Sequence, residues 1–451
     1  MKVKMHSGAI RMVIFFIKLS SLGQSPVHAK FGFIYHFYFS WCVAAERSLT
    51  VNCKKCKNLN MRNKSIATII LLLMLMAQMG TDVYLASLPA ISISLASAIT
   101  TVQYTFSIFL AGFAVSQLFY GPLSDRYGRK PCILFGLVLY SLMGLLCCFS
   151  TNALELLIAR LMQGIGAGAC TVVARAIMQD TFKGKDLDRI NIYQSMVWSI
   201  VPISAPLLGS YIQHYLGWRY NFLLLTLTGV FLLIICLIKL PETNKNKEET
   251  IHPLHVLKDY EHILINRRFF PCLIFSACIV SLLAIFNVSA PVIIQTVFNQ
   301  SPIVYGWSTF SVAITFTFGS MISHLLTSRL SPNNLMLIGW IVIACSGVAL
   351  LFVNALTQPN LYTFLIPIML MQVGSAIAFP SAAATTMRPY TQKAGKAAAV
   401  FGCTLFAGSS FASTIISGLN ITSLIPLSVF MLLLIAIMMP AYIMIRRHVH
   451  D

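Results

Sequence analysis

Twelve long apolar runs, separated by short polar connections, constrain this chain more than any other feature of its sequence. Each run is long enough to cross the ~30 Å hydrocarbon core of a bilayer as a helix that rises ~1.5 Å per residue. The runs lie at about residues 66–89, 101–120, 132–150, 152–174, 190–213, 219–240, 269–297, 303–327, 334–354, 361–387, 395–419 and 422–445. Hydrophobic residues make up 57% of the chain, which is more apolar surface than a soluble protein can bury. The sequence therefore predicts an all-α polytopic membrane protein with twelve transmembrane helices.

The basic residues indicate how these helices are oriented. The chain carries a net charge of +19. After Met61, Lys and Arg fall almost entirely in the terminal segments and in the connections after even-numbered runs, whereas the connections after odd-numbered runs contain only Arg219. Because basic residues stay on the cytosolic side of a membrane, both termini are expected in the cytosol. The positive charge is thus interpreted as a topology signal and not as a nucleic-acid-binding surface.

The longest polar stretch after Met61 divides the chain into two halves of six runs. This stretch, residues 241–268, is predicted to be a cytosolic central loop between six-helix bundles at 61–240 and 269–447. Many transporters consist of two such repeats, related by an axis along the membrane normal. A trace of the repeat is visible because Leu161-Met162-Gln163 in the fourth run recurs as Leu370-Met371-Gln372 in the tenth.

Residues 1–60 do not fit this pattern. They are basic, and their apolar patches are broken and too short to span a bilayer comfortably. They also lack the clean apolar core of a signal peptide. Cys53 and Cys56 have zinc-knuckle spacing, but no second Cys or His pair follows nearby. We interpret this segment as a non-native or disordered extension, with translation starting at Met61.

Charged residues inside membrane runs are functional candidates, because a charge in a bilayer is energetically costly. Asp82 lies in the first run and Arg160 in the fourth. Counting ~1.5 Å per residue from the run ends places both in the outer half of the membrane, at similar depth. The two are expected to pair, and a carboxyl whose pKa changes when that contact is lost suits a proton carrier. A static structural ion pair is the alternative.

Other acidic residues are rare in the membrane runs. Glu155, near the outer end of the fourth run, is either an interfacial charge or a second proton-coupling site. After Glu261 the chain has no Asp or Glu until Asp451. Carboxylate-based proton coupling is therefore expected in the first half alone.

The connection between the second and third runs, residues 121–131, is a basic hinge that contains one acidic residue, Asp125. Its glycines permit tight backbone turns, and Pro122 and Pro131 interrupt helical hydrogen bonding. A basic turn that only sets topology is the alternative interpretation. We assign a conformational latch to Gly121, Asp125, Arg126, Gly128, Arg129 and Lys130.

Two further sets of residues are candidates for function. In the fifth run, prolines and small residues can kink the helix and free carbonyl groups, or serve packing alone. These residues are Pro202, Ala205, Pro206 and Gly209. Polar and aromatic residues in runs 1, 4, 7 and 10 are candidates for the wall of a substrate cavity, with packing or lipid contact as the alternative. They are Tyr84, Gln163, Phe286, Asn287 and Gln372.

Several of these stretches resemble motifs of one transporter family. The residues that follow Gly121, in the pattern G-x-L-S-D-R-x-G-R-K, closely resemble the loop between helices 2 and 3 of the major facilitator superfamily. Residues 81–89, 160–164 and 205–209 are similar to motifs of its twelve-span drug:proton antiporters. Ala205 in place of the usual Gly is similar to the Bcr/CflA branch. The resemblance covers about residues 61–447.

The resemblance implies proton-coupled efflux of drug-like small molecules across the bacterial inner membrane by alternating access. Asp82 would alternate between a proton and Arg160 or substrate, and the Asp125 latch would contact the inner end of run 11. A monomer without metal or cofactor is expected. A proton-coupled importer or exporter of a small metabolite with the same fold is the main alternative. A membrane receptor or enzyme is the other, although no nucleophile–base pair or metal cluster supports an enzyme.

Overall fold

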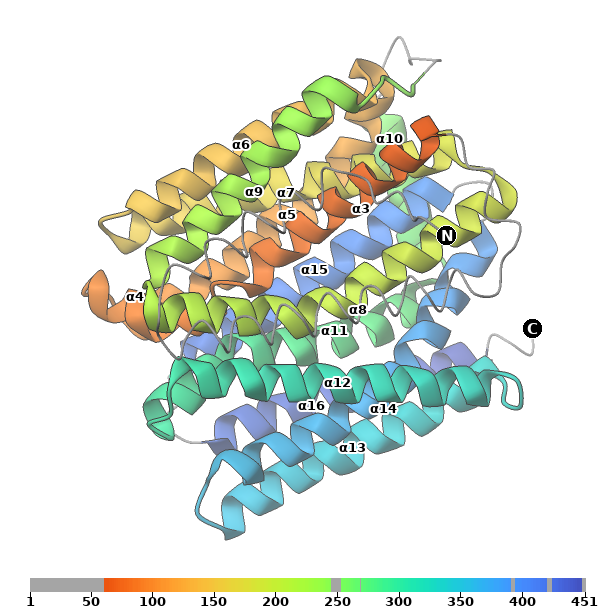
Figure 1. Cartoon of the computed structure of the whole chain (residues 1–451). Helices are drawn as coiled ribbons and strands as arrows, with labels where there is room; N and C mark the ends of the chain where they lie inside the picture. The colour runs from red at the N-terminus through yellow and green to blue at the C-terminus, as the bar shows by residue number, and fades with distance from the viewer. Residues whose placement is uncertain (1–60, 245–252, 268, 391–393, 420–423, 448–451) are drawn as a thin grey trace, which may run out of the picture. The chain divides into compact units, whose positions relative to one another are not determined.

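The computed structural model describes residues 61–244, 253–267, 269–390, 394–419 and 424–447. Every regular element in these ranges is helical (Figure 1). Twelve helical spans are long and apolar enough to cross a membrane, which confirms the predicted number. Residues 65–451 form one compact unit. The predicted extension, residues 1–60, lies outside the described residues.

Six spans precede the central loop and six follow it. The first half consists of α3 (Met61–Asp82), η2 (Leu85–Ser87), α4 (Leu88–Ser94), α5 (Ile99–Tyr127), α6 (Arg129–Phe149), α7 (Ala153–Thr181), α8 (Gly184–Tyr215) and α9 (Trp218–Lys239). A linker helix, α10, covers Pro253–Ile265. The second half consists of α11 (Phe269–Val292), the π-helical η3 (Ile293–Val297), α12 (Pro302–Thr327), α13 (Pro332–Leu356), α14 (Leu361–Met387), η4 (Arg388–Tyr390), α15 (Ala394–Gly418) and α16 (Leu424–Arg447).

Polar residues directly before the apolar runs fix where several helices begin. The side chains of Asn152, Ser301, Ser331 and Asn360 each accept a hydrogen bond from a backbone N–H in the first turn of the helix that follows. Such caps satisfy N–H groups that have no partner within the helix. The sequence therefore encodes these helix starts locally.

The two halves repeat the same packing scheme. In the first half α7 packs on α5 and α6, and α6 packs on α9. In the second half α14 packs on α12 and α13, and α13 packs on α16, which are the corresponding pairs. Glycine contacts bring the backbones together in both halves. A Cβ atom on Gly166 would lie 2.7 Å from the Gly136 carbonyl oxygen, and one on Gly374 would lie 2.7 Å from that of Gly339. This equivalence confirms the predicted two-repeat architecture.

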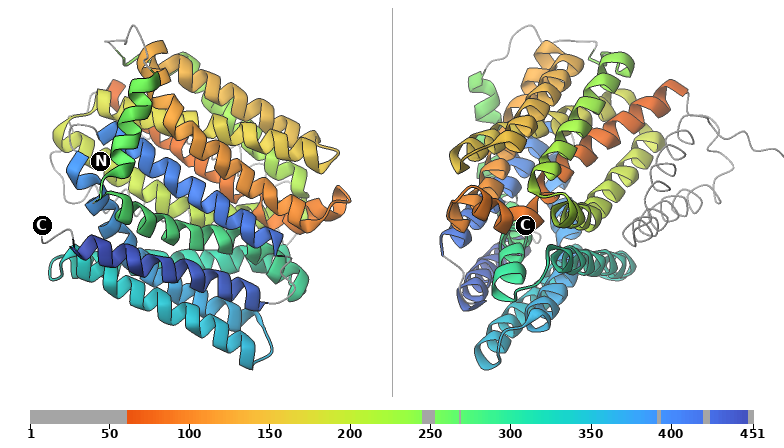
Figure 2. Two further views of the ribbon diagram at one scale, coloured as in Figure 1. Left: turned by 180° about the vertical axis from the view of Figure 1, so that it is seen from behind. Right: turned by 60° about the vertical axis from the view of Figure 1, so that its left-hand side comes forward.

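The halves meet along two pairs of helices, α5 with α15 and α8 with α12 (Figures 1 and 2). The hydroxyl groups of Ser107 and Ser413 share a hydrogen bond of 2.7 Å, and Ser410 donates to the Ser107 carbonyl at 2.7 Å. The side chain of Gln103 donates to the Val288 carbonyl at 3.0 Å. These hydrogen bonds are few, and they join neutral polar groups. A conformational change that separates the halves therefore has few polar contacts to break.

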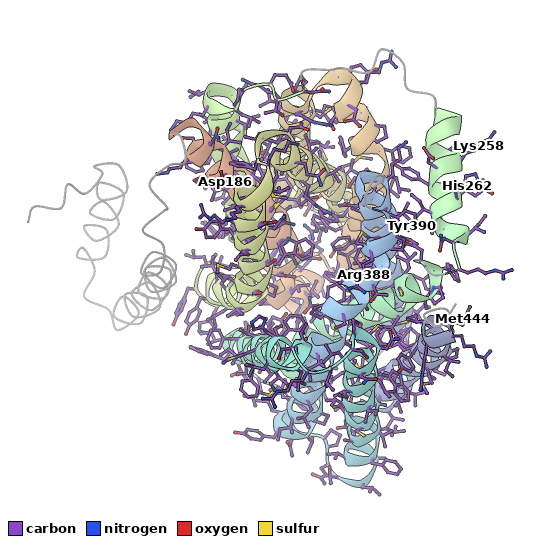
Figure 3. The ribbon with its side chains drawn as sticks, turned by 90° about the vertical axis from the view of Figure 1, so that its right-hand side faces the viewer. Asp186, Lys258, His262, Arg388, Tyr390 and Met444 are labelled. Carbon is purple, nitrogen blue, oxygen red and sulfur yellow. The ribbon has the colours of Figure 1, made fainter. Side chains whose placement is uncertain are left out.

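We call the end of the bundle at which α5 turns into α6 the basic end. It also contains the linker helix α10 and the end of α14, and Figure 3 labels Asp186, Lys258, His262 and Arg388 there. The other end, at which Asn152 begins α7 and Gly217 precedes α9, is called the opposite end.

The hinge predicted at residues 121–131 is shorter in the structure. Gly121 and Pro122 lie inside α5, which continues to Tyr127. Only Gly128, with φ of 104°, has a backbone conformation that favours glycine. Pro131 occupies the third position of α6, where a backbone N–H has no partner within the helix. The expectation of a turn at Gly121 was wrong because polar residues extend the helix beyond the apolar run.

Candidate functional site

Span 1 is broken at its acidic residue. Helix α3 ends at Asp82, the 3-10 turn η2 follows, and α4 begins at Leu88. Pro89 lies in the first turn of α4, where its missing N–H costs nothing. A break inside a membrane helix leaves backbone groups that other parts of the protein must satisfy. Polar side chains are therefore needed at this level of the bundle.

Arg160 of α7 supplies one of them. Its guanidinium is fully buried and donates to the Gly80 carbonyl at 3.0 Å and to Gln163 Oε1 at 2.7 Å. The guanidinium carbon lies 4.2 Å from the ring centre of Tyr84 and 4.1 Å from that of Phe109. Aromatic faces attract a cation through their quadrupole, most strongly where water is excluded. Arg160 is thus held by carbonyl groups and rings around the break.

Asp82 does not pair with Arg160. The side chain of Asp82 is 3% exposed. Among the described residues no ion pair joins it to Arg160, and its carboxylate interacts with the side chains of Thr81 and Gln78 on its own helix. The depth estimate from the sequence was sound, since Arg160 reaches Gly80, two residues away. The expected pair was wrong because Arg160 donates to the Gly80 carbonyl and to Gln163 in place of the Asp82 carboxylate, which residue counting does not reveal.

The small residues of span 5 pack directly on the break. A Cβ atom on Gly209 would lie 1.6 Å from the Val83 carbonyl oxygen, so the α8 backbone touches span 1 next to Asp82. Asn221 of α9 donates to the Gly209 carbonyl at 3.2 Å and to Ser87 Oγ at 2.9 Å. The predicted motif residues Pro202 and Pro206 lie inside α8, which continues through both. Ala205 is buried on the same helix.

Replacing Gly209 with alanine is expected to destabilise the protein by about 1–3 kcal/mol, the usual cost of overpacking a well-filled site. The Val83 carbonyl is backbone and cannot move aside as a flexible side chain would. Thermal unfolding of the detergent-purified protein measures the loss. Gly121→Ala is the matched control, because nothing lies within 4 Å of the added carbon there. Equal unfolding temperatures for the two variants would contradict the contact.

The candidate cavity residues separate into two groups. Tyr84 and Gln163 belong to the Arg160 cluster, and the Tyr84 hydroxyl shares a hydrogen bond of 3.1 Å with Thr105. Phe286 is buried in the second half, where its ring centre lies 6.2 Å from that of Phe364. Gln372 is also buried, and Asn287 is half-buried. Their assignment to a substrate cavity stays a prediction.

Glu155 takes part in a helix cap at the opposite end. Its carboxylate accepts hydrogen bonds from the Thr151 backbone N–H at 2.9 Å and hydroxyl at 3.1 Å. Its own backbone N–H donates to Asn152 Oδ1 at 2.9 Å. This reciprocal arrangement stabilises the first turn of α7. A role for Glu155 in proton coupling stays a prediction, and the structural role is evident.

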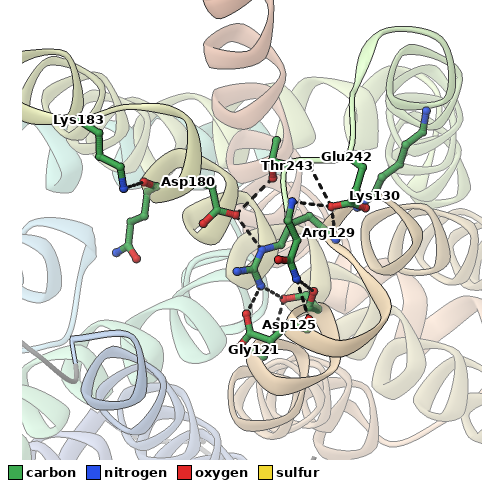
Figure 4. Close-up of polar contacts among 11 residues, drawn as sticks. Gly121, Asp125, Arg129, Lys130, Asp180, Lys183, Glu242 and Thr243 are labelled. Atoms are coloured by element: carbon green, nitrogen blue, oxygen red, sulfur yellow. Dashed lines mark hydrogen bonds and ion pairs between the residues drawn. The ribbon is translucent and has the colours of Figure 1, made fainter. Parts of the chain in front are cut away.

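At the basic end, Arg129 links three elements of the first half (Figure 4). It forms an ion pair with Asp125 one turn earlier in α5, and its Nε donates to Asp180 Oδ2 of α7 at 3.0 Å. A further bond from Nη1 reaches Ser124 Oγ at 2.6 Å. The Arg129 side chain is 10% exposed, so these bonds are partly shielded from water. The predicted latch residues Asp125 and Arg129 are thus brought together.

A residue that the sequence analysis missed completes this network. Glu242, two residues after the end of the sixth run, accepts hydrogen bonds from the backbone N–H groups of Arg129 at 2.9 Å and Lys130 at 3.1 Å. A carboxylate at a helix N-terminus satisfies free N–H groups and suits the helix dipole. Asn244 adds a bond of 2.7 Å to the Asp125 carbonyl. The sequence feature that could have indicated Glu242 is its position as an acidic residue directly after the sixth run, at the same end of the bundle as the start of α6.

The same bonds favour the ionised form of Glu242. Partial burial alone would raise the pKa of its carboxyl, but the backbone N–H donors of Asn244, Arg129, Lys130 and Thr243 outweigh burial and lower that pKa below its ordinary value. A carboxyl with a lowered pKa stabilises the folded state at all pH values above its ordinary pKa. That contribution disappears as the pH falls through the lowered value.

We expect Glu242→Gln to unfold at a lower temperature than wild type by an amount that corresponds to about 1 kcal/mol at neutral pH, as for loss of a helix cap. The difference should persist as the pH falls to the ordinary carboxyl range and vanish below it. Thermal unfolding from about pH 7 to about pH 3 tests this. Glu261→Gln, on the exposed face of α10, makes the same charge change and should show no such difference. A pH-independent difference for Glu242→Gln would rule out its charge as the cause.

The other latch residues make separate contacts, and Lys130 Nζ donates to the Leu237 carbonyl of α9 at 2.9 Å. Arg126 lies over the ring of its neighbour Tyr127. In the described part of the chain, Arg129 pairs with Asp125 and Asp180, and neither Asp125 nor Arg129 forms an ion pair with span 11. A contact of the latch with the inner end of span 11 stays a prediction. Lys396 of α15 pairs instead with Asp259 of the linker helix at 2.6 Å.

The linker helix connects both halves at the basic end. The Tyr260 hydroxyl donates to the Leu118 carbonyl of α5 at 2.9 Å. That carbonyl lacks its usual helical partner, because Pro122, four residues later, has no N–H. Burial raises the pKa of Tyr260 to about 12, so the hydroxyl keeps its proton at neutral pH. With the Asp259–Lys396 ion pair, α10 thus contacts span 2 and span 11 together.

Known proteins are similar to this chain in sequence and in fold. The family model described as Major Facilitator Superfamily matches residues 70–414. The multidrug resistance protein MdtL of Klebsiella pneumoniae (strain 342) is 30% identical over 341 residues, which cover 75% of this chain and 84% of that protein. The MdtL protein of Salmonella paratyphi A (strain ATCC 9150 / SARB42) is 30% identical over 349 residues, with the same coverage.

Solved structures share the fold at lower sequence identity. A D-xylose–proton symporter superposes with a TM-score of 0.67 at 14% identity, covering 83% of this chain and 97% of that chain. The xylose transporter XylE from E. coli, in a partially occluded inward-open conformation, superposes with a TM-score of 0.65 at 13% identity and covers 85% and 97%. At such identities the likeness concerns the arrangement of helices alone.

Proposed function

The chain belongs to the Major Facilitator Superfamily, and from that premise we propose that it exports drug-like small molecules across the bacterial inner membrane in exchange for protons. It is a multi-pass membrane transporter and not an enzyme. The multidrug resistance proteins that are 30% identical to it support the substrate class. In this proposal the basic end faces the cytosol, in line with the positive-inside rule, and the protein acts as a monomer. The Bcr/CflA branch stays a prediction.

The observation that carries the proposal is the position of Asp82. Among the acidic residues that the structure describes, it alone is buried. It lies at the break of a discontinuous membrane helix, which is where many transporters bind substrates and coupling ions. A buried carboxyl that gains and loses a proton supplies the coupling that an antiporter requires.

The remaining residues have supporting roles in this mechanism. Arg160 binds the broken span through the Gly80 carbonyl and the Tyr84 ring. These contacts lie on both sides of Asp82 in the sequence and restrict the movement of its backbone. The Arg129 network and Glu242 keep the basic end of the first half rigid while the halves move. Alternating access then requires breaking the few polar contacts between α5 and α15 and the close packing of α12 on α8 at Gly306. Tyr84, Gln163, Phe286, Asn287 and Gln372 are our candidates for substrate contact.

Drug export is tested by expressing the protein in a bacterial host that lacks its own efflux pumps. We expect reduced susceptibility to some amphipathic, aromatic drugs. We also expect proton-driven drug accumulation in everted membrane vesicles, which collapses when a protonophore removes the gradient. An unchanged susceptibility panel together with no drug accumulation in vesicles would refute the proposal.

Transport of a small metabolite is the second candidate, because the buried Asp82 would serve proton coupling equally well in an importer or exporter of that kind. Direction of transport and substrate class separate the two. Proton-dependent accumulation of a metabolite inside intact cells, with no effect on drug susceptibility, would favour the second candidate.

A further inference from the structure

A tyrosine of the second half lies beside the proposed proton site with its hydroxyl unengaged. Tyr305, in the first turns of α12, is fully buried. Within the described residues its hydroxyl has no hydrogen-bond partner at bonding geometry. The nearby hydroxyl of Thr309 donates to the Tyr305 backbone carbonyl at 3.0 Å. A buried phenol without a partner is costly to leave unsatisfied, which calls for an explanation.

Close backbone contacts fix the position of this tyrosine. A Cβ atom on the adjacent Gly306 would lie 3.2 Å from Leu207 Cα and 2.1 Å from Ser210 Oγ, so α12 touches α8 there. On the same stretch of α8, Gly209 touches the Val83 carbonyl of span 1. The second half, span 5 and the break of span 1 are therefore in direct contact around Asp82. Helix α12 also contacts η2, the turn that follows Asp82 at the break, and Tyr305 is close enough to Asp82 and Tyr84 for electrostatic interaction with both.

Most of the other polar groups around Asp82 have partners, although Arg160 Nε and Gln163 Nε2 have none among the described residues. Arg160 donates to Gly80 and Gln163, and the Tyr84 hydroxyl bonds to Thr105. From its own helix, Asp82 faces the side chains of Thr81 and Gln78, and the Thr81 hydroxyl donates to the Gln78 carbonyl at 2.5 Å. Of the titratable and charged groups at this site, Tyr305 is the one that comes from the second half and retains a free donor.

We propose that Tyr305 is a positioning residue for Asp82: when Asp82 is ionised and the halves are packed together at the opposite end, the phenol, which has no partner among the described residues here, turns to donate a hydrogen bond to the carboxylate. Hydrogen bonds to an ionised acceptor are about twice as strong as those between neutral groups. Protonation of Asp82 therefore weakens the bond. This inference rests on the proposed proton coupling and adds a contact that depends on conformation.

The bond would enforce coupling between protons and substrate. With Asp82 ionised and no substrate present, it holds α12 against α8 and span 1, so the empty transporter stays closed at the opposite end. Protonation of Asp82, or a bound substrate, weakens the hydrogen bond from Tyr305 and allows the halves to separate at the opposite end. A transporter without the bond would change conformation while empty and let substrate move downhill without proton exchange.

Tyr305→Phe tests the inference, because it removes only the hydroxyl and keeps the ring that fills the site. Since the bond favours the ionised carboxylate, its loss lets Asp82 keep its proton to higher pH. We expect the pH at which substrate-induced proton release is half-maximal to rise by about one unit, a tenfold change in proton affinity. We also expect uphill export in everted vesicles to fall while downhill substrate movement continues. Tyr442→Phe, which removes the hydroxyl of a tyrosine buried in α16 away from this site, should match wild type.

A wild-type pH profile for Tyr305→Phe, in protein that unfolds at the wild-type temperature, would overturn the inference. If the variant is unstable, a comparison in the Asp82→Asn background decides. In the Asp82→Asn protein, adding Tyr305→Phe should leave the rate of downhill substrate transport unchanged, because the carboxylate that the phenol would bind is already absent. If Tyr305→Phe changed that rate equally in wild type and in Asp82→Asn, Tyr305 would be a packing residue only. Failure of the proposed function is distinct, because wild type itself would then neither export drug nor release protons.

Discussion

Replacing Asp82 with asparagine is expected to abolish both substrate-induced proton release and uphill drug export, while the protein remains folded. Asparagine has the same size and forms hydrogen bonds, but it cannot carry a proton. Asp82 has no ion-pair partner among the described residues, so the substitution leaves no cation unpaired. Burying a neutral amide costs less than burying an ionised carboxylate, and we therefore expect no loss of thermal stability. Downhill substrate movement should survive.

Two measurements check this result. Proton release on substrate addition is followed with the detergent-purified protein, and uphill export is followed in everted vesicles at matched expression. Glu261→Gln is the control, since it removes the same charge from an exposed acid of α10, outside the membrane spans. If Asp82→Asn exported drug against a gradient and released protons as wild type does, Asp82 would be structural, and Glu155 would be the next carboxyl to test.

The second large effect is expected at the basic end. Arg129→Gln should lower uphill export at least about tenfold and destabilise the protein by about 2 kcal/mol, since hydrogen bonds to charged groups contribute about 1.5–3 kcal/mol. The substitution removes the cation between Asp125 and Asp180, so these two carboxylates are left near each other without compensation. The first half then loses the contact that joins α5, α6 and α7 at this end. Repulsion between the carboxylates adds to the loss.

Arg126→Gln is the matched control for this prediction. Arg126 is a near neighbour with the same charge, but its contact is with the ring of Tyr127. Export in everted vesicles and thermal unfolding of both purified variants give the comparison. Equal behaviour of the two variants would mean that net charge at the basic end matters and the specific Arg129 bonds do not. Normal export by Arg129→Gln would remove the latch from the mechanism.

The sequence by itself determined the number of spans, their order and the two-repeat organisation. These properties follow from the length of apolar runs and the distribution of charge along the chain, which are one-dimensional. The span motifs also singled out Asp82 and Gly209, because charges within a membrane and glycines at close contacts are unusual enough to stand out. The pattern between spans 2 and 3 singled out Arg129. Depth along a helix was predictable as well, since the rise per residue is constant.

Only the tertiary structure decided which of these residues touch. Arg160 lies at the expected depth but contacts the Gly80 carbonyl and the Tyr84 ring, and among the described residues Asp82 forms no ion pair with it. Direction around a helix axis depends on how neighbouring helices pack, and apolar spans with weak amphipathicity do not encode it. The cap that Glu242 provides to α6 and the position of Tyr305 beside Asp82 join residues more than 100 positions apart. Such contacts exist only once the helices are assembled, because no local pattern in the sequence specifies them.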